Sequence, residues 1–155
     1  MNHRWKSFAA WICPILLAGC GGHSAPDQGS GGHHHPPPHG GAGVVLGNED
    51  FHIEFLLNPD SDTMTAWFFT SHMEDYLRIK MESFEVVARP PDGEQTLIFK
   101  AVANPATGET VGNSSQFEAR AGWLKNAGHF DAVLKKVTIQ ETLHENVTFN
   151  YPGGN

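Results

Sequence analysis

Short stretches in which apolar and polar residues alternate make up most of the chain. Between Phe51 and Leu57 the odd-numbered side chains are apolar, whereas His52 and Glu54 between them are polar. A period of two is typical of a β-strand with one buried face. Turn-forming residues 58–62 follow, and residues 63–69 are rich in β-branched and aromatic side chains. We therefore predict a hairpin in which these two segments pair.

Similar segments recur along the rest of the chain, separated by residues that favour turns, such as Pro90-Pro91-Asp92-Gly93. Residues 129–139 fit either a helix or a strand with a bulge at Lys135-Lys136, and we favour the strand. The other strands are predicted at residues 44–46, 76–79, 82–89, 95–103, 115–120 and 147–151. Eight or nine short strands without a long amphipathic helix predict an all-β fold. The size fits an antiparallel β-sandwich, immunoglobulin-like or cupredoxin-like.

The first residues of the chain have the features of a targeting signal. Arg4 and Lys6 are positively charged, and residues 7–18 are mostly apolar. This apolar stretch is too short to span a bilayer but has the length found in signal peptides. It ends in Leu17-Ala18-Gly19-Cys20, which looks like a bacterial lipobox, the motif whose Cys is lipidated and becomes the first mature residue. We therefore predict a lipoprotein signal peptide at residues 1–19.

Lipidation of Cys20 would determine where the mature protein is located and which reactive side chains it retains. Several acyl chains on one residue, palmitate among them, would hold the protein stably in a lipid bilayer. In Gram-negative lipoproteins an Asp after the Cys usually signals retention in the inner membrane, and this chain has Gly21 there. The resemblance therefore implies a periplasmic protein anchored to the outer membrane. Cys13 would leave with the signal peptide, so the mature chain would have no free thiol for catalysis.

Residues 20–42 differ in composition from the rest of the chain. After the predicted lipidated Cys they are mainly Gly, Ser, Pro and His. So few apolar side chains cannot offset the entropy that is lost when a chain becomes ordered. We expect a disordered tether with a stiff insert at Pro36-Pro37-Pro38, followed by the folded domain at 43–155.

Histidines are concentrated in this tether, which holds five of the ten in the chain. Neutral imidazole binds Zn, Cu and Ni, and a mobile segment can wrap a metal ion without a preformed site. His33, His34 and His35 are therefore candidates for weak metal binding. The alternatives are a solubilising low-complexity tract or part of a tag, and the tag is disfavoured because the run lies inside a chain with its own predicted signal peptide.

A second set of candidate metal ligands falls in or beside the predicted hairpin. His52 and Glu54 lie two residues apart on one strand, so both side chains point to the same face. His72 follows the partner strand and His39 precedes the first strand, so a tether that folds back would bring all four together. Two or three imidazoles and a carboxylate suit Zn or Cu(II). The alternative is that His52 is a solvated residue on the polar side of its strand.

The charge and the motifs exclude several classes of function. The formal net charge is −7, and it becomes −9 when Arg4 and Lys6 leave with the signal peptide. A basic surface for nucleic acid is therefore not expected. The chain has no G-x-S-x-G sequence around a serine nucleophile and no glycine-rich phosphate loop between a strand and a helix. We therefore expect no enzymatic activity.

Three short motifs resemble those of known proteins. They are Pro38-His39-Gly40-Gly41, Phe51-His52-Ile53-Glu54-Phe55 and Thr70-Ser71-His72-Met73-Glu74. In this order they resemble the "PHGG" start, the "YHLEL" strand and the "DAHAE" segment of small uncharacterised bacterial lipoproteins. The HGG opening is also similar to the small β-domain of heavy-metal efflux adaptor proteins, although this chain lacks their long helical hairpin. The resemblance marks His39, His52 and His72.

Together these features predict a lipid-anchored periplasmic protein that binds or buffers a transition metal, with Cu or Zn as candidates. The alternative is a non-catalytic protein-interaction module of the cell envelope with no metal role. The expected partners are the lipid bilayer, reached through Cys20, and an envelope protein.

Overall fold

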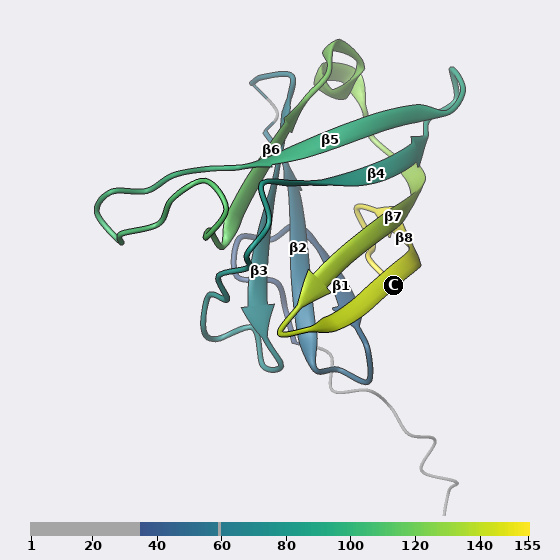
Figure 1. Cartoon of the computed structure of the whole chain (residues 1–155). Coiled ribbons are helices and arrows are strands. Elements are labelled where there is room, and N and C mark those ends of the chain that lie inside the picture. Colours follow the sequence, from purple (N-terminus) through teal and green to yellow (C-terminus); the bar gives the residue numbers. More distant parts are fainter. Residues whose placement is uncertain (1–34, 59) are drawn as a thin grey trace, which may run out of the picture. The chain divides into compact units, whose positions relative to one another are not determined.

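The structure is a computed structural model that describes residues 35–58 and 60–155. This part of the chain forms eight β-strands and one short 3-10 helix (Figure 1). They are β1 (Ala42–Leu46), β2 (Phe51–Leu57), β3 (Thr63–Thr70), β4 (Ser83–Arg89), β5 (Gln95–Ala101), β6 (Gln116–Arg120), η1 (Gly122–Asn126), β7 (Phe130–Ile139) and β8 (Thr142–Tyr151). No helix among these residues is long and apolar enough to cross a membrane. The predicted signal peptide, the predicted lipidation site Cys20 and the candidate ligands His33 and His34 lie outside the described residues.

All eight strands belong to one antiparallel sheet in the order β1-β2-β3-β6-β5-β4-β7-β8. The predicted hairpin is confirmed, because β2 pairs with β3 along its whole length, with Glu54 opposite Trp67. The segment 129–139 is a strand, and it forms a second long hairpin in which β7 pairs with β8. The strand predicted at 76–79 is wrong, since this segment makes only isolated bridges to its neighbours.

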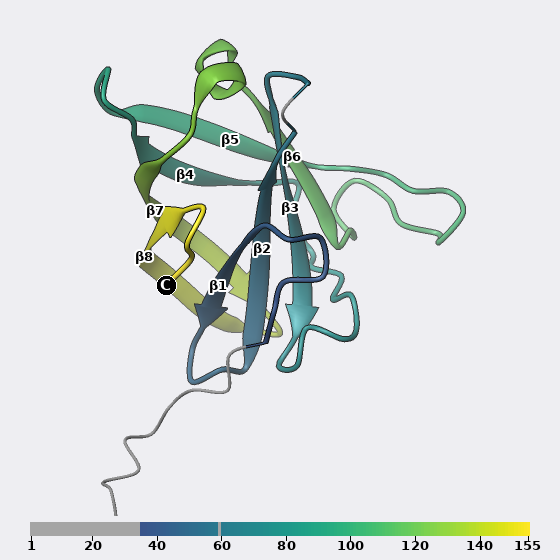
Figure 2. The same cartoon turned by 180° about the vertical axis from the view of Figure 1, so that it is seen from behind.

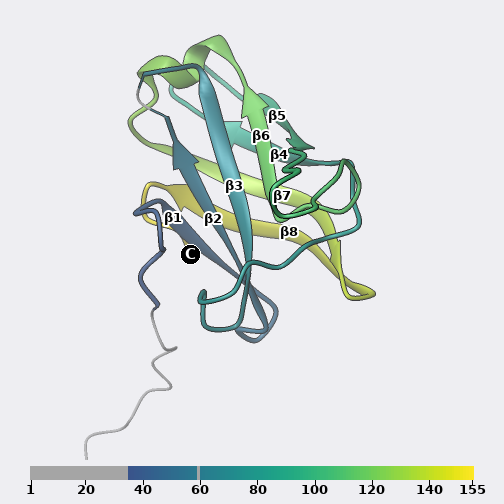
Figure 3. The same cartoon turned by 90° about the vertical axis from the view of Figure 1, so that its left-hand side faces the viewer.

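The predicted β-sandwich is also wrong, because the strands do not divide into two separate sheets. β3 pairs with β6 and β4 pairs with β7, so one continuous ladder joins the first three strands to all the others. A sandwich needs two sheets whose inner faces meet. This single sheet instead curls round until β1 and β8 approach each other, and it forms a nearly closed barrel (Figure 1, Figure 3).

Residues that follow β8 complete the wall between β1 and β8. The side chain of Asn155 accepts a hydrogen bond from the backbone amide of Val45 at 2.8 Å and donates one to the carbonyl of Val45 at 3.4 Å. The two hydrogen bonds of Asn155 take the place of the ladder that two adjacent strands would form, and the C-terminus lies beside β1 (Figure 2). At the end of β8 itself, the Tyr151 hydroxyl accepts a hydrogen bond from the amide of Leu57 on β2 at 3.3 Å.

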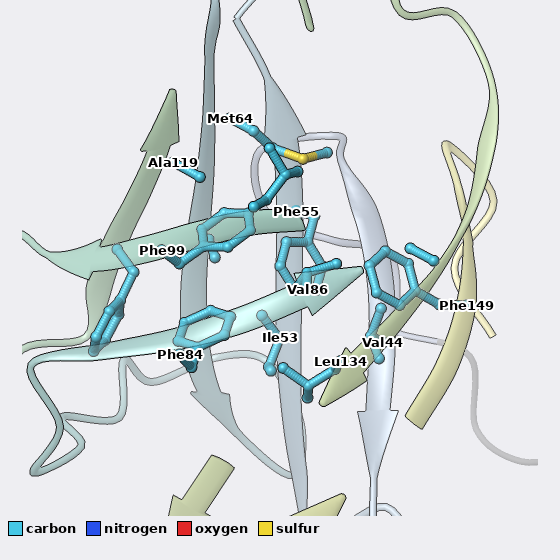
Figure 4. Packing of buried hydrophobic residues seen from close by; sticks show 14 of the residues in the cluster. Val44, Ile53, Phe55, Met64, Phe84, Val86, Phe99, Ala119, Leu134 and Phe149 are labelled. Atoms are coloured by element: carbon cyan, nitrogen blue, oxygen red, sulfur yellow. The ribbon is translucent and has the colours of Figure 1, made fainter. Parts of the chain in front are cut away.

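Aromatic side chains fill the interior of the barrel (Figure 4). Phe55 stacks on Phe149 with ring centroids 4.7 Å apart, and Phe84 stacks on Phe99 at 5.0 Å. The two pairs meet where Phe55 lies edge-on to Phe99 at 5.4 Å. These rings come from β2, β8, β4 and β5, so they join parts of the sheet that are far apart in sequence. Full burial of one such ring stabilises the fold by about 1.5–3 kcal/mol.

The β7–β8 hairpin changes face near its middle, at the predicted bulge of Lys135-Lys136. The buried side chains of β7 are even-numbered as far as Leu134 and odd-numbered from Val137. The ladder keeps the same register on either side of this point, so no residue is inserted into β7. Asn146 on β8 has a φ of 53° here, and both strands change face together in place of the predicted bulge.

Closure of the barrel requires glycine at position 154. Its φ is +92°, and a Cβ there would collide with the backbone carbonyl of Gly43 on β1. We expect Gly154→Ala to lower the free energy of unfolding by about 2–5 kcal/mol, because backbone strain and the collision both destabilise the fold. The matched control is Gly93→Ala, where φ is +111° but the surrounding space is open. This control should lose only about 1–2 kcal/mol in urea unfolding, and equal losses would contradict the close approach of the two chain segments.

Candidate functional site

Two polar side chains of β2 are buried although they point away from the barrel interior. Alternation along β2 places Ile53 and Phe55 inside, so His52 and Glu54 lie on the outer face. Their exposed fractions are nevertheless only 4% and 0%. The cover comes from residues 35–41, which run over this face before β1 begins and which we call the strap. His52 is therefore not a solvated surface residue.

The strap is attached to β2 through the carboxylate of Glu54. Oε1 accepts hydrogen bonds from the backbone amides of His39 at 2.9 Å and Gly41 at 2.7 Å. Oε2 accepts from Nδ1–H of His39 at 2.7 Å and from the amide of the same residue at 3.2 Å. All four hydrogen bonds come from the strap. They provide the polar partners without which burial of a carboxylate would be strongly unfavourable.

The imidazole of His39 is held from several directions. It stacks on the indole of Trp67 with centroids 4.0 Å apart. Nδ1 donates to Glu54, and Nε2 shares a hydrogen bond with the hydroxyl of Tyr76 at 3.1 Å. In this arrangement both ring nitrogens of His39 are already bonded within the protein, so neither is free to bind a metal ion.

Prolines and glycines fit the strap to β2. The amide of Gly40 donates to the carbonyl of Pro37 at 3.1 Å and closes a turn. A Cβ on Gly41 would collide with the carbonyl oxygen of Phe55, so glycine at this position lets the strap backbone lie close to β2. Pro37 packs against Gly43, with its Cγ 3.1 Å from where a Cβ would stand. The path of the strap therefore depends on the absence of a side chain at Gly41 and Gly43.

Three imidazoles lie together at the start of the strap. His35 belongs to the strap, His52 to β2 and His72 to the loop after β3. The ring centroid of His35 is 5.2 Å from that of His72 and 6.3 Å from that of His52. Nε2 of His35 and Nδ1 of His72 are 3.4 Å apart. We call these three residues the histidine cluster.

His52 is the buried member of the histidine cluster. Its Nδ1 is shielded from solvent and has no hydrogen-bond partner in the part of the chain that the structure describes. Burial lowers the pKa of the His52 ring below its ordinary value of 6.5, and the nearby His35 and His72 act in the same direction. A hydrogen bond with the backbone of Thr70 and the charge of Glu49 only partly oppose this shift. The ring is therefore held in its neutral form, which is the form that binds metal ions.

The distance between two rings of the histidine cluster suits a metal ion, although the three rings are not already arranged around one ion position. Two imidazole nitrogens on one tetrahedral zinc lie about 3.3 Å apart, because Zn–N bonds are about 2.0–2.1 Å long. The separation of 3.4 Å between His35 and His72 is close to this value. Among residues 35–58 and 60–155, no three His, Cys, Asp or Glu side chains are already arranged to hold a metal ion. His72 is exposed and His35 is half-buried, so their rings can rotate toward His52 without disturbing the core.

The four ligands predicted near the hairpin fall into two groups. His39 and Glu54 bond to each other, whereas His52 and His72 lie with His35 in the histidine cluster. The structure thus does not bring all four predicted side chains to one point. Metal binding by these residues stays a prediction.

The position of His35 and the role of two aromatic side chains do not follow from the sequence pattern. By composition alone, His35 belongs only to the weak candidate ligands of the tether. Trp67 and Tyr76 belong to no recognisable motif, yet they hold the ring of His39. The signal that identifies His35 is its spacing, four residues before His39 across three prolines, which restrict the backbone between the two side chains.

A cleft lined by Trp67, Tyr76, Arg78 and Glu109 adjoins the strap. The carboxylate of Glu109 accepts hydrogen bonds from the amide of Ser115 at 2.9 Å and from its hydroxyl at 2.6 Å. Burial would raise the pKa of Glu109, but these hydrogen bonds and the charge of Arg78 outweigh it and hold the pKa below its ordinary value of 4.5. Glu109 thus fixes the long loop between β5 and β6 against the start of β6.

We expect Glu109 to make stability depend on pH in the acidic range. Its pKa is depressed in the folded state, so its contribution is complete above 4.5 and is lost as the pH falls toward the folded-state value. Between about pH 6 and pH 4, the free energy of unfolding of Glu109→Gln should therefore fall less than that of the wild type, by up to about 0.8 kcal/mol, which is the most that one carboxyl with an unfolded-state pKa of 4.5 can lose over this range. Glu94→Gln, at an exposed ion pair, is the control and should follow the wild type. Parallel curves for wild type and Glu109→Gln would contradict this role.

The whole chain was also compared with known proteins. Comparisons with protein families, with curated proteins and with solved structures found no match. The resemblance of its motifs to small lipoproteins and to heavy-metal efflux adaptors therefore stays a prediction. The functional conclusion depends on the contacts of the strap and the histidine cluster.

Proposed function

We propose that this protein is a lipid-anchored periplasmic module that binds a transition-metal ion through the histidine cluster. The observation that carries the proposal is the position of His35, whose ring centroid lies 5.2 Å from that of His72 and 6.3 Å from that of His52. The buried Nδ1 of His52 has no hydrogen-bond partner among the described residues. A buried nitrogen without a partner is energetically costly, and a metal ion bound there would satisfy it. Three imidazoles with a fourth position open to water are a known ligand set for zinc.

Zn(II) and Cu(II) are the ions that suit this cluster best. Imidazole binds both of them, and it does so in the neutral form that burial favours at His52. The described residues contain no cysteine, so this part of the chain offers no thiolate ligand. Because His72 is exposed, a bound ion would remain accessible to exchange with another carrier. These properties support a role in binding or buffering the ion reversibly. They do not favour a structural metal that stays bound to stabilise the fold.

The N-terminal sequence supports the proposed location. The lipobox-like Leu17-Ala18-Gly19-Cys20 would place an acyl anchor at the start of the mature chain, and Gly21 favours the outer membrane. The strap is the last part of the segment that connects this anchor to the barrel. A metal site at the junction of tether and barrel would therefore lie on the periplasmic side of the membrane.

Metal titration of the full chain tests the proposal. In a background that carries Gln at His23, His33 and His34, we expect one Zn(II) or Cu(II) ion per chain to bind in isothermal titration. His72→Ala should weaken binding at least about tenfold, because loss even of a residue that only supports a metal ligand typically costs this much. His129→Ala removes an exposed imidazole elsewhere and is the matched control, so it should leave the affinity unchanged.

A second variant tests the same site, and its folding is checked separately. His52→Ala removes the buried member of the cluster, and circular dichroism together with urea unfolding establishes whether this variant is folded. Equal affinity of the wild type and both cluster variants would contradict the proposal. That outcome would favour the alternative of a protein-interaction module with no metal role.

A further inference from the structure

We infer that Glu54 sets the metal affinity of the histidine cluster by holding the strap in place, without touching the metal ion itself. This role rests on the proposed function, because it concerns the same cluster. Glu54 is a positioning residue in the sense that its carboxylate binds the strap, and the strap carries His35.

Only one of the three imidazoles lies on the strap. His52 is on β2 and His72 follows β3, so the pairing of these two strands keeps both on the barrel whether or not the strap is bound. His35 reaches them only while the strap lies over β2. The complete cluster therefore depends on an attachment that strand pairing does not provide.

That attachment is concentrated at one side chain. Both oxygens of Glu54 accept hydrogen bonds, and the donors are two backbone amides and one imidazole of the strap. Glu54→Gln would replace one acceptor oxygen by an NH2 group that faces a donor. Because the side chain is completely buried, water cannot compensate for this mismatch while the strap is bound. The substitution should therefore release the strap and leave the barrel core unchanged.

Stiff residues connect the bound part of the strap to His35. Pro36, Pro37 and Pro38 lie between His35 and His39, and the proline ring fixes φ at each of these three positions. The turn from Gly40 to Pro37 adds a further restraint. When Glu54 fixes His39, it therefore also limits the positions that His35 can take.

Binding of the strap and binding of the metal should stabilise each other. When the competent state of a site is only partly populated, the apparent affinity equals the intrinsic affinity multiplied by the populated fraction. By linkage, the factor by which attachment of the strap raises the metal affinity is also the factor by which the metal ion favours the attached strap. Loss of the Glu54 carboxylate should thus weaken metal binding, and it should do so by way of His35.

A double-mutant cycle in the full chain tests this role, with Co(II) as the probe because its visible spectrum changes with the number of ligands. The same background without His23, His33 and His34 is used throughout. Glu54→Gln should weaken Co(II) binding about tenfold and shift the spectrum toward that of His35→Ala. In a chain that already carries His35→Ala, Glu54→Gln should have no further effect.

Two more variants separate release of the strap from other effects. Gly41→Ala keeps the carboxylate of Glu54, but its Cβ would collide with the carbonyl of Phe55, would lie 3.0 Å from Cγ of Glu54 and would displace the strap. It should therefore reproduce the loss seen with Glu54→Gln. Glu118→Gln changes a carboxylate on β6 that bonds to Gln116, and as the matched control it should leave Co(II) affinity unchanged.

The outcomes separate the role of Glu54 from the proposed function. Unchanged affinity in Glu54→Gln and Gly41→Ala, together with a loss in His72→Ala, would overturn the positioning role and leave the metal site intact. An effect of Glu54→Gln that is equally large with and without His35 would also overturn this role, because it would indicate general damage. Unchanged affinity in the His72 and His52 variants would overturn the proposed function itself.

Discussion

The alternation of side chains along β2 is the constraint on which the rest of the structure depends. Ile53 and Phe55 point into the barrel, where Phe55 contacts rings from β5 and β8. His52 and Glu54 must therefore point outward, side by side. A shift of one residue in the pairing of β2 with β3 would exchange the two sets of side chains. The packing of the core thus also determines which groups face the strap, and a shift of register would change both faces together.

The local part of the fold could be predicted from the sequence, whereas the long-range part could not. The β2–β3 hairpin follows from alternation on both sides of a turn-forming segment, 58–62, and these signals lie within the segment itself. The sandwich prediction failed because short alternating strands occur in sandwiches and barrels alike. The pairing of β3 with β6 and of β4 with β7 decides between them. These partner strands are distant in the chain, so the alternation of apolar and polar residues within each strand does not show that they pair.

The residues of the candidate site could be predicted one by one, but their grouping could not. Strand period and side-chain chemistry point to His52 and Glu54, and the hairpin places His72 near them. The pairing of Glu54 with His39 depends on the path of the strap, whose prolines and glycines have no hydrophobic pattern. The burial of His52 depends on the same cover. An alternating strand shows which face a residue occupies, but not what lies over that face.

The hydrogen bonds between Asn155 and Val45 affect how molecules of this protein meet at high local concentration, which the proposed membrane anchor would produce. The edge strand of a sheet offers unpaired amides and carbonyls, to which a strand of another chain can add. On β1 the backbone groups of Val45 are already occupied by the Asn155 side chain. A second molecule would have to displace the residues after β8 before it could extend the sheet. The bonds that close the barrel therefore also oppose aggregation through its edge at high local concentration.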